Sequence, residues 1–182
     1  MPGGCTSRIG LHQGLLLPED YHDADFGNDP NHVNYNKVYV NNEAILRKAF
    51  SRRDLLPAHE LDAFIEKHQS WLPDYALYMA LKKHFGDRPW EEWDDEIRRR
   101  TPESLDYYSN RYRNDILYFQ FVQYIAYWQW NSLKSYVNRQ GIAIIGDIPI
   151  YAAADSADTW SNAASGIFQY NRELTPACVA GC

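Results

Sequence analysis

The stretch that decides the fold is Ile142-Ala143-Ile144-Ile145-Gly146-Asp147-Ile148-Pro149-Ile150-Tyr151. It is rich in β-branched side chains and apolar at successive positions, and it follows a segment with helical spacing. A continuous apolar run of this kind is typical of a strand that is buried on both faces of a parallel sheet. Pro149 has no N–H to donate, so it marks the place where the strand's hydrogen bonds end. The sequence therefore predicts one buried parallel strand.

Asp147 lies near the carboxyl end of this predicted strand. Parallel α/β folds gather their chemistry at that end of the strands, which makes Asp147 a candidate functional residue. The alternative is a structural acid that bonds the backbone or an arginine at the strand end. Farther along the chain, Asp155-Ser156-Ala157-Asp158 has the pattern of a helix start, and we interpret Asp155 and Asp158 as capping acids.

Upstream of the strand, apolar residues recur at helical spacing from Pro57 onward. The pattern predicts a helix through Leu72, then a second helix that has Pro73 in its first turn and ends at Gly86, so that the two form a helical hairpin. His68 lies on the apolar stripe of the first helix, and we interpret it as a packed core histidine rather than a metal ligand. The arginines at the end of Glu96–Arg100 are interpreted as a solvated last helical turn rather than a phosphate site.

Thr101-Pro102 combines a capping hydroxyl with a proline at the first helical position. From Leu105 to Tyr136 the chain has neither glycine nor proline, and the spacing predicts one long helix that Gly141 ends. The middle of this helix, Ile116–Trp130, is apolar or aromatic nearly all round and is expected to be buried on more than one side. Rows of aromatic rings also stack on sugars, but helical packing explains these rings without a ligand.

The run from Gly14 to Tyr39 is rich in Asp and Asn and predicts loop structure. Asp23, Asp25 and Gly27 are similar to the start of a calcium loop. However, the twelfth position is Asn34 instead of the glutamate that an EF-hand needs, which favours a polar surface loop.

Composition narrows the function further. The chain has 182 residues, a length that favours one soluble domain, and 45% of them are hydrophobic, which excludes a disordered chain. Its 18 basic and 24 acidic residues give a formal net charge of -6, which excludes a basic nucleic-acid binder. Cys5, Cys178 and Cys182 fit neither a disulfide framework nor a zinc site and are expected to be free thiols. With no secretory leader or membrane segment in the sequence, we expect a cytoplasmic location and no membrane partner.

The stretch Gly146–Tyr151 followed by Asp155–Trp160 closely resembles the third-strand signature of amylomaltases, the bacterial 4-alpha-glucanotransferases. The resemblance covers roughly Leu11 to Gly181. Further segments resemble the family in the same order along the chain: Asp25-Phe26-Gly27, Leu46–Phe50, Trp71–Leu81, Trp90 with Trp93, and Phe168-Gln169.

The resemblance implies a parent (β/α)8 TIM barrel with large helical insertions. It implies an enzyme that cleaves alpha-1,4-glucans and passes the glycosyl unit to another sugar by retaining double displacement, without metal or organic cofactor. It also implies that Asp147 is a substrate-binding carboxylate, and that the catalytic carboxylates lie on later barrel strands, beyond Cys182. No catalytic residue is therefore expected within this chain.

The expected fold class is mainly α: a helical insertion subdomain plus one buried parallel strand of the parent barrel. We expect a disordered, non-family start over residues 1–10, the helical subdomain over 11–140, and the strand, a loop and a short helix over 141–182. The function implied is that of a 4-alpha-glucanotransferase fragment, inactive alone, whose partners are maltooligosaccharides and, through the exposed strand, other copies of itself. The alternative is a non-catalytic helical module that binds glucan or a partner protein through its aromatic rows.

Overall fold

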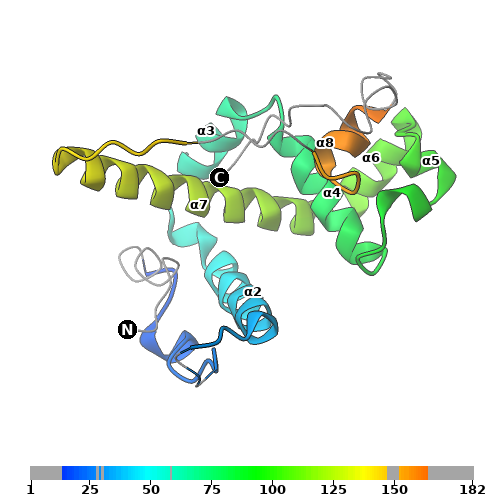
Figure 1. Ribbon diagram of the computed structural model, residues 1–182. Coiled ribbons are helices and arrows are strands. Elements are labelled where there is room, and N and C mark those ends of the chain that lie inside the picture. The colour runs from blue at the N-terminus through cyan, green and yellow to red at the C-terminus, as the bar shows by residue number, and fades with distance from the viewer. Residues whose placement is uncertain (1–13, 28, 30, 58, 147–151, 164–182) are drawn as a thin grey trace.

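Helices form the regular secondary structure that this computed structural model describes (Figure 1). The structure describes residues 14–27, 29, 31–57, 59–146 and 152–163. The α-helices in these ranges are α2 (Tyr35–Ser51), α3 (Glu60–Lys67), α4 (Leu72–His84), α5 (Asp95–Arg98), α6 (Pro102–Arg111), α7 (Arg113–Arg139) and α8 (Ala157–Ser161). Single 3₁₀ turns are η1 (Pro18–Asp20), η2 (Arg53–Leu55) and η3 (Trp90–Glu92). In the same ranges no helix is long and apolar enough to span a membrane.

Helix α7 is the axis around which the other helices are arranged (Figure 1). Helices α2, α3, α4 and α6 all contact it, and α4 also contacts α8. The main core forms where α2, α3 and α4 meet the N-terminal half of α7. Phe121 of α7 is fully buried there, and Phe50 packs against it at 5.5 Å between ring centroids and against Tyr118 at 5.4 Å. Many of the aromatic residues therefore serve as core.

A second cluster joins the other end of α4 to α5 and α8. Its buried members include Leu81, Trp93, Ile97 and Trp160. Trp93 lies 5.7 Å from Trp160 between ring centroids, in an edge-to-face arrangement that aromatic quadrupoles favour. This cluster attaches α8, which follows the predicted strand in the chain, to the helical part of the molecule.

The two predicted helices are present as α3 and α4, but the first ends at Lys67, and Leu72, predicted as its last apolar residue, begins α4. Pro73 lies in the first turn of α4, and Gly86 follows the helix with a φ of +66°, a conformation that costs glycine little. The predicted start at Thr101 is also confirmed, because its hydroxyl accepts a hydrogen bond from the backbone N–H of Ser104 at 3.3 Å. His68 packs among aromatic rings, with ring centroids 4.5 Å from Phe64.

The prediction of one long helix from Leu105 to Tyr136 is wrong, because Tyr112 separates α6 from α7. The backbone of Tyr112 leaves helical geometry, with φ −107° and ψ 24°. Its ring stacks on Tyr108 at 6.1 Å, and its hydroxyl lies 2.7 Å from Nδ1 of His84 in α4. A contact with α4 thus accompanies the break, and no glycine or proline marks it in the sequence.

The loop predicted up to Tyr39 ends earlier, because α2 begins at Tyr35. Asn34, the residue that weakened the calcium interpretation, caps this helix by accepting from the backbone N–H of Lys37 at 3.1 Å. Asp25 is engaged by the Lys37 ammonium at 2.5 Å and by the Gly27 N–H at 2.9 Å. Its carboxylate therefore joins the loop to α2.

The apolar run 142–151 forms no strand over its described part, residues 142–146. Parallel pairing needs a neighbouring strand, and the described ranges contain none. Ile142 is 60% exposed and Ile145 is 94% exposed. The remainder of the run, with Ile148 and Pro149, lies outside the described residues, as do the predictions for residues 1–10, for the three cysteines and for Phe168-Gln169.

Exposed isoleucines after α7 lead to a first prediction. At tens of micromolar the purified chain should self-associate, because association removes apolar surface from water. Replacing both Ile142 and Ile145 by serine should shift the population toward monomer. Leu55→Ser, which changes an exposed leucine elsewhere, should not. Sedimentation velocity provides the measurement, and a monodisperse monomer of the unaltered chain that binds no hydrophobic dye would contradict the prediction.

Asp20 joins the η1 turn to the C-terminal end of α2, and its pKa leads to a second prediction. Its buried carboxylate pairs with Arg52 and accepts from the Leu17 N–H at 2.8 Å. The hydrogen bond from Arg52 lowers the pKa of Asp20 from 3.8 to about 2. A lowered folded-state pKa stabilises the fold above pH 3.8, and that contribution is lost as the pH falls toward 2.

The thermal midpoint of the unaltered chain should therefore exceed that of Asp20→Asn at pH 6, and the two should converge between pH 4 and pH 2. Asp54→Asn, which alters an exposed carboxylate on η2, is the matched control. A difference between Asp20→Asn and the unaltered chain that stays constant over this interval would rule out the Asp20 pairing as its source.

Candidate functional site around the segment after Asp147

Asp147, the predicted substrate-binding residue, lies outside the described residues. The structure resumes at residue 152, and the following segment through Ala163 lies against α4 (Figure 1) and is bonded to Trp90 of η3. We refer to residues 152–163 as the α8 segment. The way in which this segment is attached determines where the helical subdomain meets the chain that carries Asp147.

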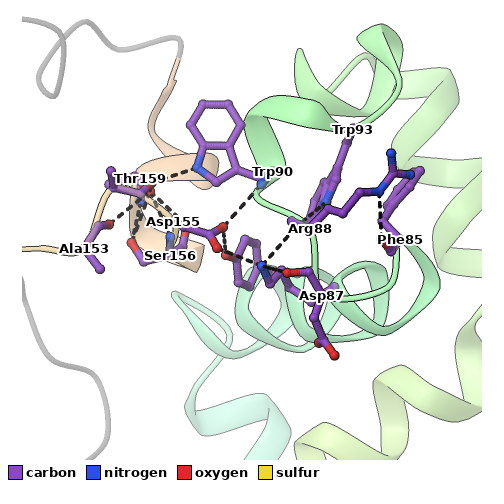
Figure 2. Close-up of polar contacts among 12 residues, drawn as sticks. Phe85, Asp87, Arg88, Trp90, Trp93, Ala153, Asp155, Ser156 and Thr159 are labelled. Atoms are coloured by element: carbon purple, nitrogen blue, oxygen red, sulfur yellow. Dashed lines mark hydrogen bonds and ion pairs between the residues drawn. The ribbon is translucent and has the colours of Figure 1, made fainter.

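Asp155 is the main attachment point of the α8 segment. Its carboxylate accepts hydrogen bonds from the Tyr78 hydroxyl at 2.7 Å, the Lys82 ammonium at 2.7 Å and the backbone N–H of Trp90 at 3.3 Å (Figure 2). The indole N–H of Trp90 donates in turn to the carbonyl of Ala154 at 2.9 Å. These bonds tie the segment to both α4 and η3.

The capping interpretation of Asp155 is wrong, because Ser156 is the N-cap of α8. The Ser156 hydroxyl accepts from the Thr159 N–H, and the Thr159 hydroxyl accepts from the Ser156 N–H, each at 3.3 Å. Ser156 starts the helix one residue later than predicted, which leaves Asp155 free for Lys82. Asp158 lies in the first helical turn, where a negative charge is favourable, but its carboxylate makes no capping bond within the described residues.

Lys82 uses its full donor capacity at this site. Besides Asp155 it donates to the carbonyls of Asp87 and Arg88, both at 2.9 Å, and an ammonium has three N–H groups. Its side chain is only 14% exposed. Although burial opposes the negative charge, the hydrogen bonds from Lys82, Tyr78 and the Trp90 N–H hold the pKa of Asp155 below its ordinary value. Burial and the adjacent carboxylate raise the pKa of Tyr78, which stays protonated as a donor.

The Lys82–Asp155 pair leads to a third prediction. Removing either partner leaves the other's hydrogen bonds unmade, so Lys82→Met and Asp155→Asn should each lower the free energy of unfolding by about 1–3 kcal/mol. The double variant should lose less than the sum, since the two side chains act together. Glu66→Gln, at an exposed carboxylate on α3, is the control, and strictly additive losses in urea denaturation would contradict a direct coupling.

The arginine run at residues 98–100 divides into two parts. Arg98 and Arg99 are exposed and pair with Asp95, as expected for a solvated helix end. For Arg100 the interpretation as a solvated helix end is wrong. Its guanidinium lies 4.3 Å from the Trp160 ring centroid, and its Nη2 donates to Asp74 at 2.6 Å. A cation stacked on an indole is stabilising, so Arg100 belongs to the attachment of α8.

Sequence reasoning singled out Trp90 and Asp155 but did not find their partners. Tyr78 and Lys82 are four residues apart on α4 and therefore point to the same side of that helix, which is the one signal that could have indicated a shared contact. The described residues contain no group of three or more His, Cys, Asp or Glu side chains that could hold a metal ion.

The aromatic row of α7 is buried only in part. Tyr118, Phe121 and Tyr124 lie in the core, as predicted, whereas Trp128 and Trp130 near the C-terminal end are more than a third exposed. The helix therefore presents partly exposed aromatic rings in its C-terminal half.

Comparison with known proteins shows which family this chain resembles. Residues 5–181 match the model of a protein family described as 4-alpha-glucanotransferase. The chain is 39% identical over 171 residues to the 4-alpha-glucanotransferase of Clostridium butyricum and 36% identical over 174 residues to that of Streptococcus pneumoniae. These alignments cover 93% and 94% of the chain but 35% and 34% of the relatives, so it spans about a third of their length.

A solved structure agrees with the sequence matches. The amylomaltase from Streptococcus agalactiae, determined in complex with acarbose, superposes with a TM-score of 0.79 and 36% sequence identity. The match covers 86% of this chain and 32% of the amylomaltase. The match of residues 5–181 to the family model, with a shared fold at this level of identity, shows that the chain belongs to the 4-alpha-glucanotransferase family.

Proposed function

We propose that this chain forms the helical subdomain, and the adjoining barrel segment, of an enzyme that transfers alpha-1,4-glucan segments between sugars. The observation that carries the proposal is the match to the family model over residues 5–181. In this account the chemistry is retaining double displacement, which needs a nucleophilic carboxylate and an acid/base about 5 Å from it. The substrates are alpha-1,4-glucans such as maltooligosaccharides.

Within that enzyme, residues 142–151 are the third strand of a (β/α)8 barrel and Asp147 binds substrate near the cleaved bond. The location of the α8 segment supports this assignment. Trp90, Lys82 and Tyr78 hold residues 154–155 against the helical subdomain only a few residues after Asp147. The attachment would fix the chain beyond the strand while the strand itself pairs with its neighbours.

The proposal further holds that this chain alone does not catalyse transfer. It spans about a third of the length of its relatives, and the family resemblance assigns the catalytic carboxylates to later strands. Asp155 is paired with Lys82 and Tyr78 through both of its oxygens and is therefore not free to act as a nucleophile. Glucan transfer therefore requires residues that this chain does not supply.

A second candidate function is a non-catalytic helical module that binds glucan or a protein. The observation in its favour is the exposed aromatic surface of α7, where Trp128 and Trp130 are 36% and 38% exposed. In the enzyme interpretation the same surface packs against the barrel. The two candidates therefore assign different partners to one helix face.

Reading the gene beyond codon 182 distinguishes the two functions. The enzyme interpretation predicts an open frame that continues into Pro-Pro-Asp-Tyr and the later acidic motifs of the family. A stop codon in the native gene directly after Cys182 would contradict it and favour the module.

A further inference from the structure

A hollow of about 440 Å³ lies between the start of α4 and α8. Trp71, Asp74 and Tyr75 line it on the α4 side, and Asp158 and Ser161 line it on the α8 side. Its volume falls in the range of small-molecule sites. We propose that this α4–α8 hollow binds a sugar ring of an alpha-1,4-glucan. The identity of the sugar rests on the proposed function, whereas the chemistry of the site rests on the residues that line it.

Hydrogen bonds within the protein hold the aromatic wall of the hollow in place. The indole N–H of Trp71 donates to His68 Nδ1 at 3.3 Å, and the Tyr75 hydroxyl accepts from the Gln123 amide at 2.9 Å. The two rings lie 6.0 Å apart between centroids, with planes at 63°. Because their polar atoms bond elsewhere, the rings present apolar surface to the hollow, and the C–H face of a pyranose packs on such surface.

Each wall supplies a carboxylate oxygen that has no donor among the described residues. The Asp158 carboxylate is half-buried and has no hydrogen-bond or ion-pair partner among the residues described here, and burial raises its pKa. Across the hollow, Asp74 gives Oδ1 to Arg100, while its Oδ2 has no such partner in the same part of the chain. These carboxylate oxygens can accept hydrogen bonds, and the hydroxyl groups of a sugar supply the donors.

The charges around the hollow narrow the class of ligand. Two carboxylates and no described Lys or Arg side chain line it, so a phosphate or other anion is disfavoured. The described residues also lack the three or more ligating side chains that a metal site would use. A neutral polyhydroxylated ring matches both walls, and the glucan of the proposed function has such rings.

The test uses the complete 182-residue chain and maltotriose or maltoheptaose as the probe, with cellotriose as the β-linked control sugar. An NMR titration of the backbone amides should show shifts concentrated at residues 71–79 and 156–162. Asp158→Asn keeps the side-chain volume and removes the charge, and it should raise Kd about tenfold or more, the effect of losing a hydrogen bond to a charged group. Glu103→Gln removes a carboxylate from the first turn of α6 and should leave Kd unchanged.

Several results would overturn the inference. If maltoheptaose binds with equal Kd to the unaltered chain and to Asp158→Asn, or shifts only residues elsewhere, the location of the site is wrong while the proposed function stands. If the folded chain binds no maltooligosaccharide, or binds cellotriose equally well, the α4–α8 hollow is not an alpha-glucan site. If Asp158→Asn does not fold, the backbone amide shifts of the unaltered chain still show whether maltoheptaose binds at the α4–α8 hollow. Glucan transfer by a family-length enzyme tests the proposed function separately.

Discussion

Replacing Trp160 with alanine is expected to lower the free energy of unfolding by about 3–5 kcal/mol, as large-to-small changes in a core do. Trp160 has no exposed surface, and its indole N–H donates to the Ile97 carbonyl at 3.2 Å. The change would leave a cavity, an unmade hydrogen bond and an Arg100 guanidinium without the ring on which it stacks. The loss should therefore lie toward the upper end of the range.

Urea denaturation followed by circular dichroism measures this loss. Trp130→Ala is the matched control, because Trp130 is 38% exposed on α7 and its removal should cost about 1 kcal/mol or less. Equal losses for the two variants would mean that the α8 segment contributes little to the fold, and the attachment described around Asp155 would have to be abandoned.

The second large effect concerns activity. The purified chain, incubated with maltotriose, should release no measurable glucose, because the family resemblance assigns the nucleophile and the acid/base of double displacement to later barrel strands. The control is the 4-alpha-glucanotransferase of Clostridium butyricum, assayed under the same conditions. That relative is 39% identical to this chain, which covers 35% of its length. Glucose release that one substitution within this chain abolishes would contradict the account.

Local signals in the sequence predicted the helical elements best. Pro73, Gly86 and Thr101 each fix a backbone conformation or satisfy a terminal N–H through their own chemistry, and the structure places helix ends at all three. Helix α2 was missed because the polar residues before Asn34 read as an extended loop, although Ile45, Ala49 and Phe50 form its buried side. These three residues all lie in the C-terminal half of the helix, so none of its buried residues marks its start.

Features that depend on distant partners could not be predicted. The hydroxyl of Tyr112, at the break, contacts His84, 28 residues earlier in the chain, and the role of Asp155 depends on Lys82, 73 residues earlier. Spacing along the chain carries no information about such pairs. The predicted strand over 142–151 depends on another kind of distant partner. Its hydrogen bonds need neighbouring strands, and the described residues contain none. Asp147 remains a predicted substrate-binding residue.

The central claim is that this chain supplies the helical subdomain and Asp147 to a glucan-transferring enzyme. A chimera tests it: the 171-residue matched segment of the Clostridium butyricum relative is replaced by the corresponding residues of this chain. Asp147→Asn in the chimera is the companion variant. If Asp147 bonds sugar hydroxyls more strongly in the transition state, turnover should fall by about tenfold or more while the thermal midpoint changes little.

The deciding measurement is glucose release from maltotriose by the chimera, with the thermal midpoint determined on the same preparation. The account predicts a cooperatively folded chimera that transfers glucan, and an Asp147→Asn variant with lowered turnover and an unchanged midpoint. A folded chimera without transfer would contradict the claim. Near-normal turnover of Asp147→Asn, together with a large drop in its midpoint, would show that Asp147 is a structural acid.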